Sequence, residues 1–587
     1  MMWKPMLPTL VEDIPKGEDW VYEVKYDGFR CGLEWNEDAV KLWSRNGTDL
    51  TPQFPEIVEW CEEHAEEAKP YLPLFLDGEL VVLETRLRAN FSMIQKRGRT
   101  KSNEGVDKLS HHRPATLVIF DGLQLKGKNI ENQLLHKRRE QLEQFFKEME
   151  WELTDPSQRI HLVDQYVRED QAWKDVFLHQ GEGLVAKNQR SKITNGKRTT
   201  KWQKVKNWRT VTGFLTTWNM ENDYYDVSIY RGDDIILLGK LKHGFDDEQK
   251  ATLRKFVKEN GGKVDANTWE IPPSVCVEVN CLEAKDRELR EPVFQQFRFD
   301  LEPKDCTYEA VREGLGQLPN SIEISKPDKY LFPDFNKRDF VLYLREVAPL
   351  LLPRLKNKRL TMIRFPDGID EHSFYQKHLP DYAPEFIQTV PGEDDEEDIV
   401  CQDLQTLLWF GNHAAIEYHV PFQRIDSNLP DEMVFDLDPP TLKQFPLAVL
   451  AAQLIKEMCE HQGFRVNVKT SGKTGLQLHI PLEEDMTFDD TREFMEAVAK
   501  VLVEKYPESF TIERLKKNRG NKLYLDYIQH APGKTIIAPY SPRATKEGTV
   551  ATPLFWDELN ESLDPRDFTM DIIPKRLKEK GCPFFNA

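Results

Sequence analysis

The chain has 587 residues, of which 39% are hydrophobic, 11% aromatic and 30% charged. At roughly 100–200 residues per domain, this length predicts about three to five domains with cores of their own. The 80 Lys and Arg against 99 Asp and Glu give a net charge of −19, which excludes a uniformly basic nucleic-acid coat but leaves room for a local basic surface.

The eight cysteines and the absence of long apolar runs indicate the compartment. Eight cysteines in a chain of this length, without a CxxC pair, exclude a disulfide scaffold and argue against a structural zinc site. No apolar run approaches the about 18 residues of a membrane span, and the first residues lack the pattern of a signal peptide. We therefore expect a cytoplasmic protein without a membrane partner.

Alternating apolar and polar residues dominate the first 205 positions, and this period-two pattern is typical of strands. We expect strands within 19–35, 39–45, 75–83, 115–123 and 182–187, and one longer helix at 132–149. Short strands and turns follow at 211–218, 226–241 and 275–283, which predicts a small barrel. After an expected connector at about 309–325, helices are predicted at 340–355 and 447–462 among further strands.

A basic segment closes the first strand-rich part. Residues 187–206 contain eight basic side chains and no acidic one. Cations without counter-ions repel one another, so the segment favours a polyanionic partner.

The first candidate site begins at Lys25 in the sequence KYDG (25–28). By itself this motif is equally typical of a strand-edge lysine before a turn. Its context is more informative, because polar residues recur at the ends of later strands: 44–47 (SRNG), 77–80 (DGEL), 120–122 (FDG), 182–187 (EGLVAK) and 202–206 (WQKVK).

These residue types suit covalent nucleotide transfer. A lysine that attacks a phosphate must be neutral, so its pKa has to fall from about 10.4. We expect Arg30, Lys204 and Lys206 to lower that pKa and to hold the triphosphate. The carboxylates of Glu79 and Glu182 can bind a divalent metal or ribose hydroxyls, although each alone is equally a solvated strand-end residue.

Two further side chains complete this interpretation. Phe120 offers a stacking face for a purine. Arg45 is expected to clamp a phosphate in bidentate fashion.

In order and spacing, these segments resemble motifs I, Ia, III, IIIa, IV and V of the covalent nucleotidyltransferases, which include ATP-dependent DNA ligases, RNA ligases and capping enzymes. The resemblance implies Lys25 as the adenylate acceptor and Phe120 as the adenine stack. It also implies nucleotide and metal contacts by Arg30, Arg45, Glu79, Glu182, Lys187, Lys204 and Lys206. The barrel-like segment resembles the OB domain of these ligases, and Arg298-Phe299-Asp300 resembles motif VI, whose arginine orients pyrophosphate, although Leu301 replaces the family's lysine.

A second candidate site is the strand VFDLDP (434–439). Because side chains alternate along a strand, Asp436 and Asp438 point to the same face. Paired aspartates at a strand end are typical of two divalent metals that handle a triphosphate, but a turn-capping role is equally consistent with this motif alone. A third carboxylate, Asp526, ends another apolar strand. The turn TSGKTG (470–475) between them can present N–H groups and a cation to phosphates.

This set, from about Ile324 to the end of the chain, resembles the archaeo-eukaryotic primase superfamily, in particular the polymerase domain of the bacterial ligase D family. The resemblance implies metal ligation by Asp436, Asp438 and Asp526 and a triphosphate contact by His419. It places Ser471, Gly472, Arg519, Gln529 and Arg543 at the incoming nucleotide. It assigns Lys329 and Lys337 to a downstream 5′-phosphate, and Phe374 and Tyr375 to a template base.

The turn departs from the family's usual SGGKGLH. Lys473 is displaced by one position and Gln477 replaces a histidine, so either Lys473 or Thr474 takes the family's triphosphate contact.

Together the two resemblances predict an α+β multidomain chain. A covalent nucleotidyltransferase domain (1–206) and an OB-fold β-barrel (207–303) precede a linker (304–323) and a primase-like α/β polymerase domain (324–587). The expected function is non-homologous end joining, in which NTPs or dNTPs fill gaps and ATP with Mg²⁺ or Mn²⁺ seals nicks. Expected partners are double-stranded DNA ends, nicked and gapped DNA with a 5′-phosphate, and bacterial Ku.

Two alternatives remain at this point. The C-terminal half could be a non-catalytic DNA-end-binding module attached to a ligase. Uncompensated carboxylates repel DNA unless metals occupy them, so the three aspartates argue against this module. The N-terminal half could also be an RNA ligase or a capping enzyme.

Overall fold

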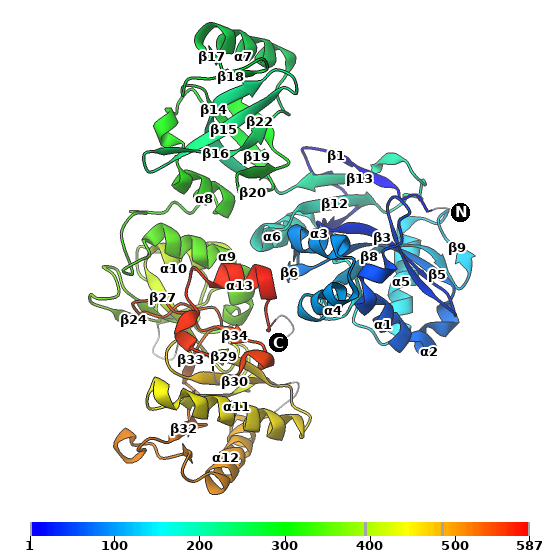
Figure 1. Ribbon diagram of the computed structural model, residues 1–587. Helices are drawn as coiled ribbons and strands as arrows, with labels where there is room; N and C mark the ends of the chain where they lie inside the picture. Colours follow the sequence, from blue (N-terminus) through cyan, green and yellow to red (C-terminus); the bar gives the residue numbers. More distant parts are fainter. Residues whose placement is uncertain (1–2, 393–395, 483–485, 561, 585–587) are drawn as a thin grey trace.

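The protein is described by a computed structural model that covers residues 3–392, 396–482, 486–560 and 562–584 (Figure 1). The period-two segments of the sequence form sheets, and the predicted helices at 132–149, 340–355 and 447–462 are confirmed as α5 (Leu135–Glu148), α9 (Lys337–Leu355) and α11 (Phe445–Glu460).

Two sheets build the N-terminal part. Its strands are β1 (Leu7–Leu10), β2 (Trp20–Val24), β3 (Phe29–Trp35), β4 (Val40–Ser44), β5 (Leu74–Val81), β6 (Leu83–Thr85), β7 (Arg88–Ala89), β8 (Thr116–Leu125), β9 (Lys128–Asn129), β10 (Ile160–Leu162), β11 (Gln165–Tyr166), β12 (Gly183–Asn188) and β13 (Arg198–Lys206). One sheet has the order β1-β13-β12-β2-β11, and the other has the order β10-β8-β5-β3-β4 with β9 beside β8. Within the second sheet, the buried Leu33 and Leu76 are partners in register across β3 and β5.

Helices cover these sheets with their apolar faces. They are α1 (Pro55–Glu63), α2 (Ala65–Ala68), α3 (Phe91–Arg99), α4 (Asn103–His112), α5 and α6 (Glu169–His179). Ile57, Ile94 and Phe146 from α1, α3 and α5 pack into the core of the second sheet. Val176 of α6 packs with β2 and β12 of the first, so the strand ends that carry the candidate residues lie on a fixed framework.

The middle part is a twisted antiparallel sheet. Its elements are β14 (Arg209–Asn219), β15 (Tyr224–Arg231), β16 (Asp234–Leu241), α7 (Asp247–Asn260), β17 (Gly262–Lys263), β18 (Thr268–Glu270), β19 (Cys276–Cys281), β20 (Glu283–Lys285), β21 (Glu288–Arg290) and β22 (Val293–Phe297). The expected barrel is not a continuous closed ladder in the described residues. A single parallel bridge between His243 and Val293 joins the two edges, because β22 pairs in full only with β19.

The expected connector contains a helix of its own, α8 (Tyr308–Gly316). Val311 of α8 is 3% exposed and packs into the core of the middle sheet. Gly314 lies so close to β14 that an added Cβ would come within 2.2 Å of the Thr210 carbonyl oxygen. The segment therefore covers the barrel-like sheet as well as linking it to the rest of the chain.

The C-terminal part also contains two main sheets. The first has the order β24-β23-β27-β33, with strands β23 (Thr361–Arg364), β24 (Phe374–Gln376), β27 (Ala415–Pro421) and β33 (Thr535–Ile537). The second has the order β31-β32-β28-β30-β29-β34, with β28 (Glu432–Asp438), β29 (Asn467–Thr470), β30 (Leu476–Pro481), β31 (Phe510–Thr511), β32 (Leu523–Asp526) and β34 (Pro553–Leu554). The pair β25 (Thr389–Pro391) and β26 (Glu397–Ile399) stands apart, and the helices are α9, α10 (Leu404–Asn412), α11, α12 (Phe488–Lys505) and α13 (Ile573–Lys580).

Figure 1 shows the C-terminal part beside the N-terminal one, with α9 and α13 near α6 and β6. All eight cysteines are free and buried, as expected for a chain without a disulfide scaffold. Among the described helices, none has the length and apolarity that crossing a bilayer requires.

Candidate active sites

A cavity of about 550 Å³ opens between the two N-terminal sheets. It brings together seven of the residues predicted from the sequence: Lys25, Arg30, Arg45, Glu79, Phe120, Lys187 and Lys204. They come from β3, β5, β8, β12 and β13 and from the turns after β2 and β4, so both N-terminal sheets contribute to the lining.

Phe120 lies on one wall of this cavity among cations. The Arg30 guanidinium is 4.2 Å from the Phe120 ring centroid, and the Lys187 ammonium is 4.5 Å from it. Arg30 is held in place by two bonds to Asp77, at 2.6 and 2.7 Å. An aromatic ring bordered by cations is suited to a purine that carries phosphates.

Lys25 makes an ion pair that the sequence did not indicate. Its ammonium donates to Glu182 Oε2 at 2.5 Å. Burial lowers the pKa of Lys25, but the charge and hydrogen bond of Glu182 outweigh it and leave the pKa raised. The expectation that neighbouring cations lower this pKa is therefore wrong, because the carboxylate of Glu182 is the nearest charge.

Glu79 lies near Lys25, and its carboxylate accepts a bond from the Gly28 N–H at 3.2 Å. Burial raises the pKa of Glu79 to about 7, against the attraction of Lys25 and Arg30. Lys204 has a lowered pKa because of burial and of the charges of Lys25 and Lys206.

The basic segment 187–206 has acidic partners that its own sequence does not contain. Lys187 is 2% exposed and pairs with Glu23 at 2.5 Å. Lys206 pairs with Glu291, and Arg190 pairs with Asp19 at 3.2 Å. The counter-ions come from distant parts of the chain, which explains why the local sequence did not reveal them.

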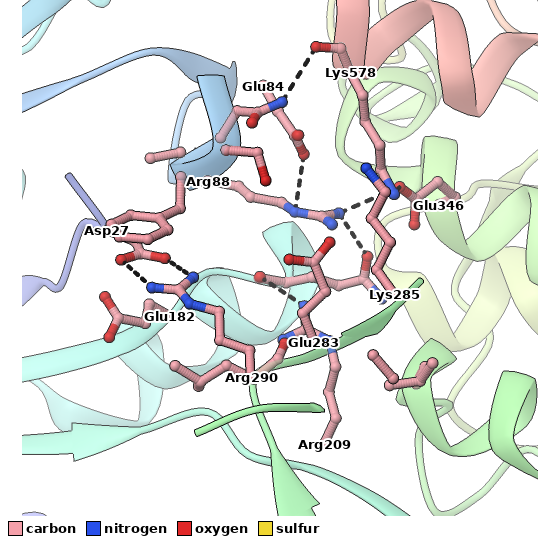
Figure 2. Close-up of a pocket in the computed structure, with 18 of the residues that line it drawn as sticks. Asp27, Glu84, Arg88, Glu182, Arg209, Glu283, Lys285, Arg290, Glu346 and Lys578 are labelled. Carbon is pink, nitrogen blue, oxygen red and sulfur yellow. Dashed lines mark hydrogen bonds and ion pairs between the residues drawn. The ribbon is translucent and has the colours of Figure 1, made fainter. Parts of the chain in front are cut away.

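Three predicted residues, Glu182, Lys206 and Arg298, do not line the nucleotide cavity. Glu182 lines a second, smaller cavity on the other side of Lys25. Arg298 is bound by Glu278 at 2.9 Å and by Asp300 at 2.7 Å and does not line the nucleotide cavity. Arg290 of β21, by contrast, lines the second cavity and donates to Asp27 Oδ1 at 2.6 Å (Figure 2).

In the C-terminal part, the three aspartates share one face of the second sheet. Asp436 of β28 is the register partner of Asp526 on β32, and Asp438 follows two residues later on the same face. Phe435 and Leu437 are 0% exposed on the opposite face. Burial and then the charge of Asp438 raise the pKa of Asp436 to about 7.

Sequence reasoning missed a polar row that continues across this sheet. The Gln477 amide donates to Asp436 Oδ1 at 3.1 Å, and Lys469 in turn donates to Gln477 Oε1. Lys469 is 0% exposed, and burial lowers its pKa to about 7. In register, Lys469, Gln477, Asp436 and Asp526 form one line over four strands, a pairing that no single segment of sequence contains.

Glu417 is the second residue that sequence reasoning missed. Its buried carboxylate lies 3.1 Å from His419 Nε2, 3.3 Å from Arg543 Nε and 3.8 Å from Lys473 Nζ. Burial opposes its charge, but these partners, His419 first, lower the pKa of Glu417 to about 2. The position of Glu417 two residues before His419 on a strand was the available signal, since such residues share a face.

Ser471 and Gly472 form the turn beside this cluster. The Ser471 hydroxyl oxygen accepts bonds from the N–H groups of Lys473 and Gly475, at 3.3 and 3.1 Å. Gly472 has φ +72°, and an added Cβ would come within 2.5 Å of Arg543 Cγ, so a side chain does not fit there.

The comparisons with known proteins cover both halves of the chain. The family described as ATP dependent DNA ligase domain matches residues 5–206, and the family described as LigD, primase-polymerase domain matches residues 336–584. The bifunctional non-homologous end joining protein LigD of Bacillus subtilis is 39% identical over 99% of this chain and 96% of its own length. The chain belongs to the LigD family.

Two further relatives have lower sequence identity. The multifunctional LigD of Pseudomonas aeruginosa is 26% identical over 98% of this chain and 71% of its own length. The solved polymerase domain of Mycobacterium tuberculosis Ligase D, in complex with DNA, is 28% identical, with a TM-score of 0.41, over 44% of this chain and 96% of that one.

Family membership decides between the alternatives that the sequence left open. This LigD chain combines an ATP-dependent DNA ligase domain with a primase-polymerase domain, in this order, and acts in non-homologous end joining. The C-terminal half is accordingly a nucleotidyltransferase domain rather than a bare DNA-end-binding module.

Of the remaining predicted residues of the polymerase half, Arg519 and Gln529 lie beside the aspartates. Arg519 stacks on Tyr524, 3.6 Å from its centroid, and the Gln529 N–H donates to Asp526 Oδ1 at 2.9 Å. Lys329 pairs with Asp367 at 2.7 Å, and Lys337 donates to the Ser325 hydroxyl at 3.1 Å. The aromatic pair on β24 is exposed at the surface, with Phe374 at 37% and Tyr375 at 73%.

Proposed function

We propose that this LigD protein seals nicks through a lysyl-adenylate on Lys25 and fills gaps at Asp436, Asp438 and Asp526. The observation that supports the first half is the position of Lys25 in the lining of the nucleotide cavity, beside a carboxylate that can accept its proton. The predicted domain boundaries, 1–206, 207–303, 304–323 and 324–587, are part of the same proposal.

In the adenylation step, Lys25 Nζ attacks the α-phosphorus of ATP. An N–P bond forms, and the bond to the pyrophosphate oxygen breaks. Glu182 Oε2, at 2.5 Å from Nζ, takes the proton that the ammonium must lose. Phe120 stacks on the adenine. The nucleotide and its phosphates are held by the cations Arg30, Arg45, Lys187, Lys204 and Lys206.

The carboxylates fit divalent cations by their chemistry. The three aspartates share a sheet face, and burial and mutual repulsion raise the pKa values of Asp436 and Asp438, an energetic cost that a bound cation would relieve. Within the described residues, no group of three or more His, Cys, Asp or Glu is already arranged as a metal site. Mg²⁺ or Mn²⁺ would neutralise developing charge on the phosphates there. In the ligase half, the carboxylates of Glu79 and Glu182 would be the metal ligands.

In the polymerase half, the imidazole of His419 and the positive charges of Lys473 and Arg543 face the triphosphate, and Glu417 keeps them together. Ser471, Gly472, Arg519 and Gln529 position the incoming NTP or dNTP. Phe374 and Tyr375 stack on a template base. We further propose bacterial Ku, DNA ends and nicked or gapped DNA as partners, in the cytoplasm at the nucleoid.

One substrate tests this proposal as a whole. A gapped duplex with a 5′-phosphate should be filled and sealed by one preparation, with each NTP omitted in turn. Filling that stops at the omitted nucleotide supports templated synthesis, and sealing that requires ATP supports the lysyl-adenylate. Sealing of nicked RNA but not of nicked DNA, or labelling by GTP in place of ATP, would contradict it.

The pH dependence of adenylation should reveal the ionisation of Glu79. Because the pKa of Lys25 is raised, the fraction of Lys25 in the neutral amine form increases about tenfold per pH unit up to about pH 9. Glu79, whose pKa is about 7, is ionised above that pH and protonated below it. We expect log(kcat/KM) for ATP to rise with slope 2 below pH 7 and slope 1 above it.

The Glu79→Gln variant is the control for this profile. It should react more slowly and with slope 1 throughout, because only Lys25 still titrates. An unchanged break near pH 7 in the variant would assign that break to another group, such as ATP itself.

Lys329 and Lys337 should favour a phosphorylated 5′ end, because a terminal phosphate carries more charge than an internal one. Losing one charge-assisted contact costs about 1.5–3 kcal/mol, or roughly ten- to more than a hundredfold in affinity. Fluorescence anisotropy on gapped DNA with and without the 5′-phosphate measures the effect in Lys329→Ala and Lys337→Ala. The exposed Lys534→Ala is the matched control, and equal preferences in all three variants would rule out the assignment.

A further inference from the structure

A second cavity, of about 250 Å³, lies where the three parts of the chain meet (Figure 2). Lys25 and Asp27 line it from the N-terminal part, Arg290 from the OB part, and Glu346 and Lys578 from the polymerase part. Lys25 therefore borders two cavities, the nucleotide cavity on one side and this junction cavity on the other.

The charges of the junction cavity are balanced, which argues against a site for a small anion. Six basic and five acidic side chains line it. Most of them pair with one another: Lys25 with Glu182, Arg290 with Asp27, Arg88 with Glu84 at 3.1 Å and with Glu346 at 3.3 Å. Two of these pairs, Arg290 with Asp27 and Arg88 with Glu346, join different parts of the chain, and such complementary pairing is typical of an interface between domains.

The polymerase part is docked at this junction by buried contacts. The Arg345 guanidinium of α9, 1% exposed, donates to the carbonyl oxygens of Phe177 at 2.6 Å and Leu178 at 2.9 Å, in the last turn of α6. The side chains of Phe177 and Leu178 pack against the polymerase core. The Asn90 amide of the ligase donates to the Lys578 carbonyl oxygen at 3.2 Å.

The same arginine reaches the hinge between the adenylation and OB parts. Arg345 Nε donates to the Gln317 carbonyl oxygen at 3.2 Å. The Gln317 amide donates to Asn207 Oδ1 at 2.9 Å and to the Trp208 carbonyl oxygen at 3.0 Å. These two residues form the only link in sequence between β13 and β14, so docking of the polymerase part also holds the OB part in place.

The two cavities differ in what they can admit. The nucleotide side has about 550 Å³, within the about 300–1,000 Å³ typical of small-molecule pockets. The junction side has about 250 Å³, which is below even the about 300 Å³ lower bound for small-molecule pockets. A DNA duplex therefore does not fit there. Lys25 lines both cavities, so an adenylate that fills the nucleotide side leaves the junction side as the open approach to Lys25 for the 5′-phosphate of a nick.

We propose that the docked polymerase domain closes the DNA-facing side of the ligase centre while leaving its ATP-facing side open. The protein can then adenylate itself in the docked state, and sealing requires the polymerase domain to move away. This inference rests on Lys25 as the adenylate acceptor. A wild-type protein that ATP fails to label would contradict the proposed function itself, whereas the experiments below compare proteins that are labelled.

The first experiment fixes the docked state with a cross-link. Ser92 and Lys578 are exposed and line the junction cavity from opposite domains. Because all eight native cysteines are buried, a bismaleimide should join Ser92→Cys to Lys578→Cys selectively. We expect unchanged labelling by ATP, unchanged primer extension and at least a tenfold loss of nick sealing. The same double variant capped with N-ethylmaleimide is the control, and equal sealing by the two proteins would overturn the proposal.

The second experiment weakens docking in the full chain. Glu346→Lys replaces the ion pair with Arg88 by two like charges. Glu504→Lys, on the exposed end of α12, carries the same charge change outside the junction. We expect pre-adenylated Glu346→Lys to seal nicks about three- to tenfold faster than Glu504→Lys at limiting DNA, with equal primer extension. Equal or slower sealing would show that docking does not limit access of DNA to Lys25.

Discussion

Replacement of Lys25 by alanine should abolish labelling of the protein by α-labelled ATP, while nucleotide addition by the polymerase half continues. The phosphoamide forms on the Lys25 nitrogen itself, so no neighbouring residue can substitute for the missing amine. The two centres use different sheets, with Lys25 after β2 and the three aspartates on β28 and β32. The loss should therefore be complete for one activity and absent for the other.

Denaturing gel electrophoresis after incubation with labelled ATP measures the first activity, and extension of a primer on a template measures the second. Lys201→Ala is the matched control, because this exposed lysine lies on β13 outside the nucleotide cavity. Labelling retained in Lys25→Ala would rule out this nucleophile. Loss of both activities would show that the two halves do not work independently.

The strands and their candidate residues were predictable because period-two patterns are local. Asp436 and Asp438 share a face for that reason, and their partner Asp526 was found as another strand-end carboxylate. The nucleotide cavity likewise collects seven residues that the sequence analysis assigned to the nucleotide and its metal.

The counter-ions were not predictable by the same means. Lys25 pairs with Glu182, 157 positions away, and that contact reverses the expected direction of the Lys25 pKa. Lys187 pairs with Glu23 because β2 and β12 are neighbouring strands. The order of strands in a sheet is a property of the whole fold, so the local sequence does not reveal this pair. Closure of the OB sheet failed as a prediction for a related reason, since it depends on how two distant edges meet.

Removal of Asp436 and Asp438 together should eliminate primer extension and leave adenylation of Lys25 intact. The double Asp436→Ala, Asp438→Ala variant loses two of the three carboxylates that share the sheet face. Metal-assisted displacement supplies several kcal/mol of charge stabilisation, and each about 1.4 kcal/mol corresponds to tenfold in rate. We therefore expect extension to fall by at least about a thousandfold.

The loss should come from chemistry rather than from unfolding. We expect the change not to lower the free energy of unfolding, because burial and the charge of Asp438 raise the pKa of Asp436 and so oppose its charged form. The thermal midpoint of the double variant should accordingly stay at or above that of the wild type, while Asp489→Ala, an exposed aspartate on α12, keeps full extension. Extension by the double variant at the wild-type rate would show that VFDLDP is a turn cap and that the metal ligands lie elsewhere.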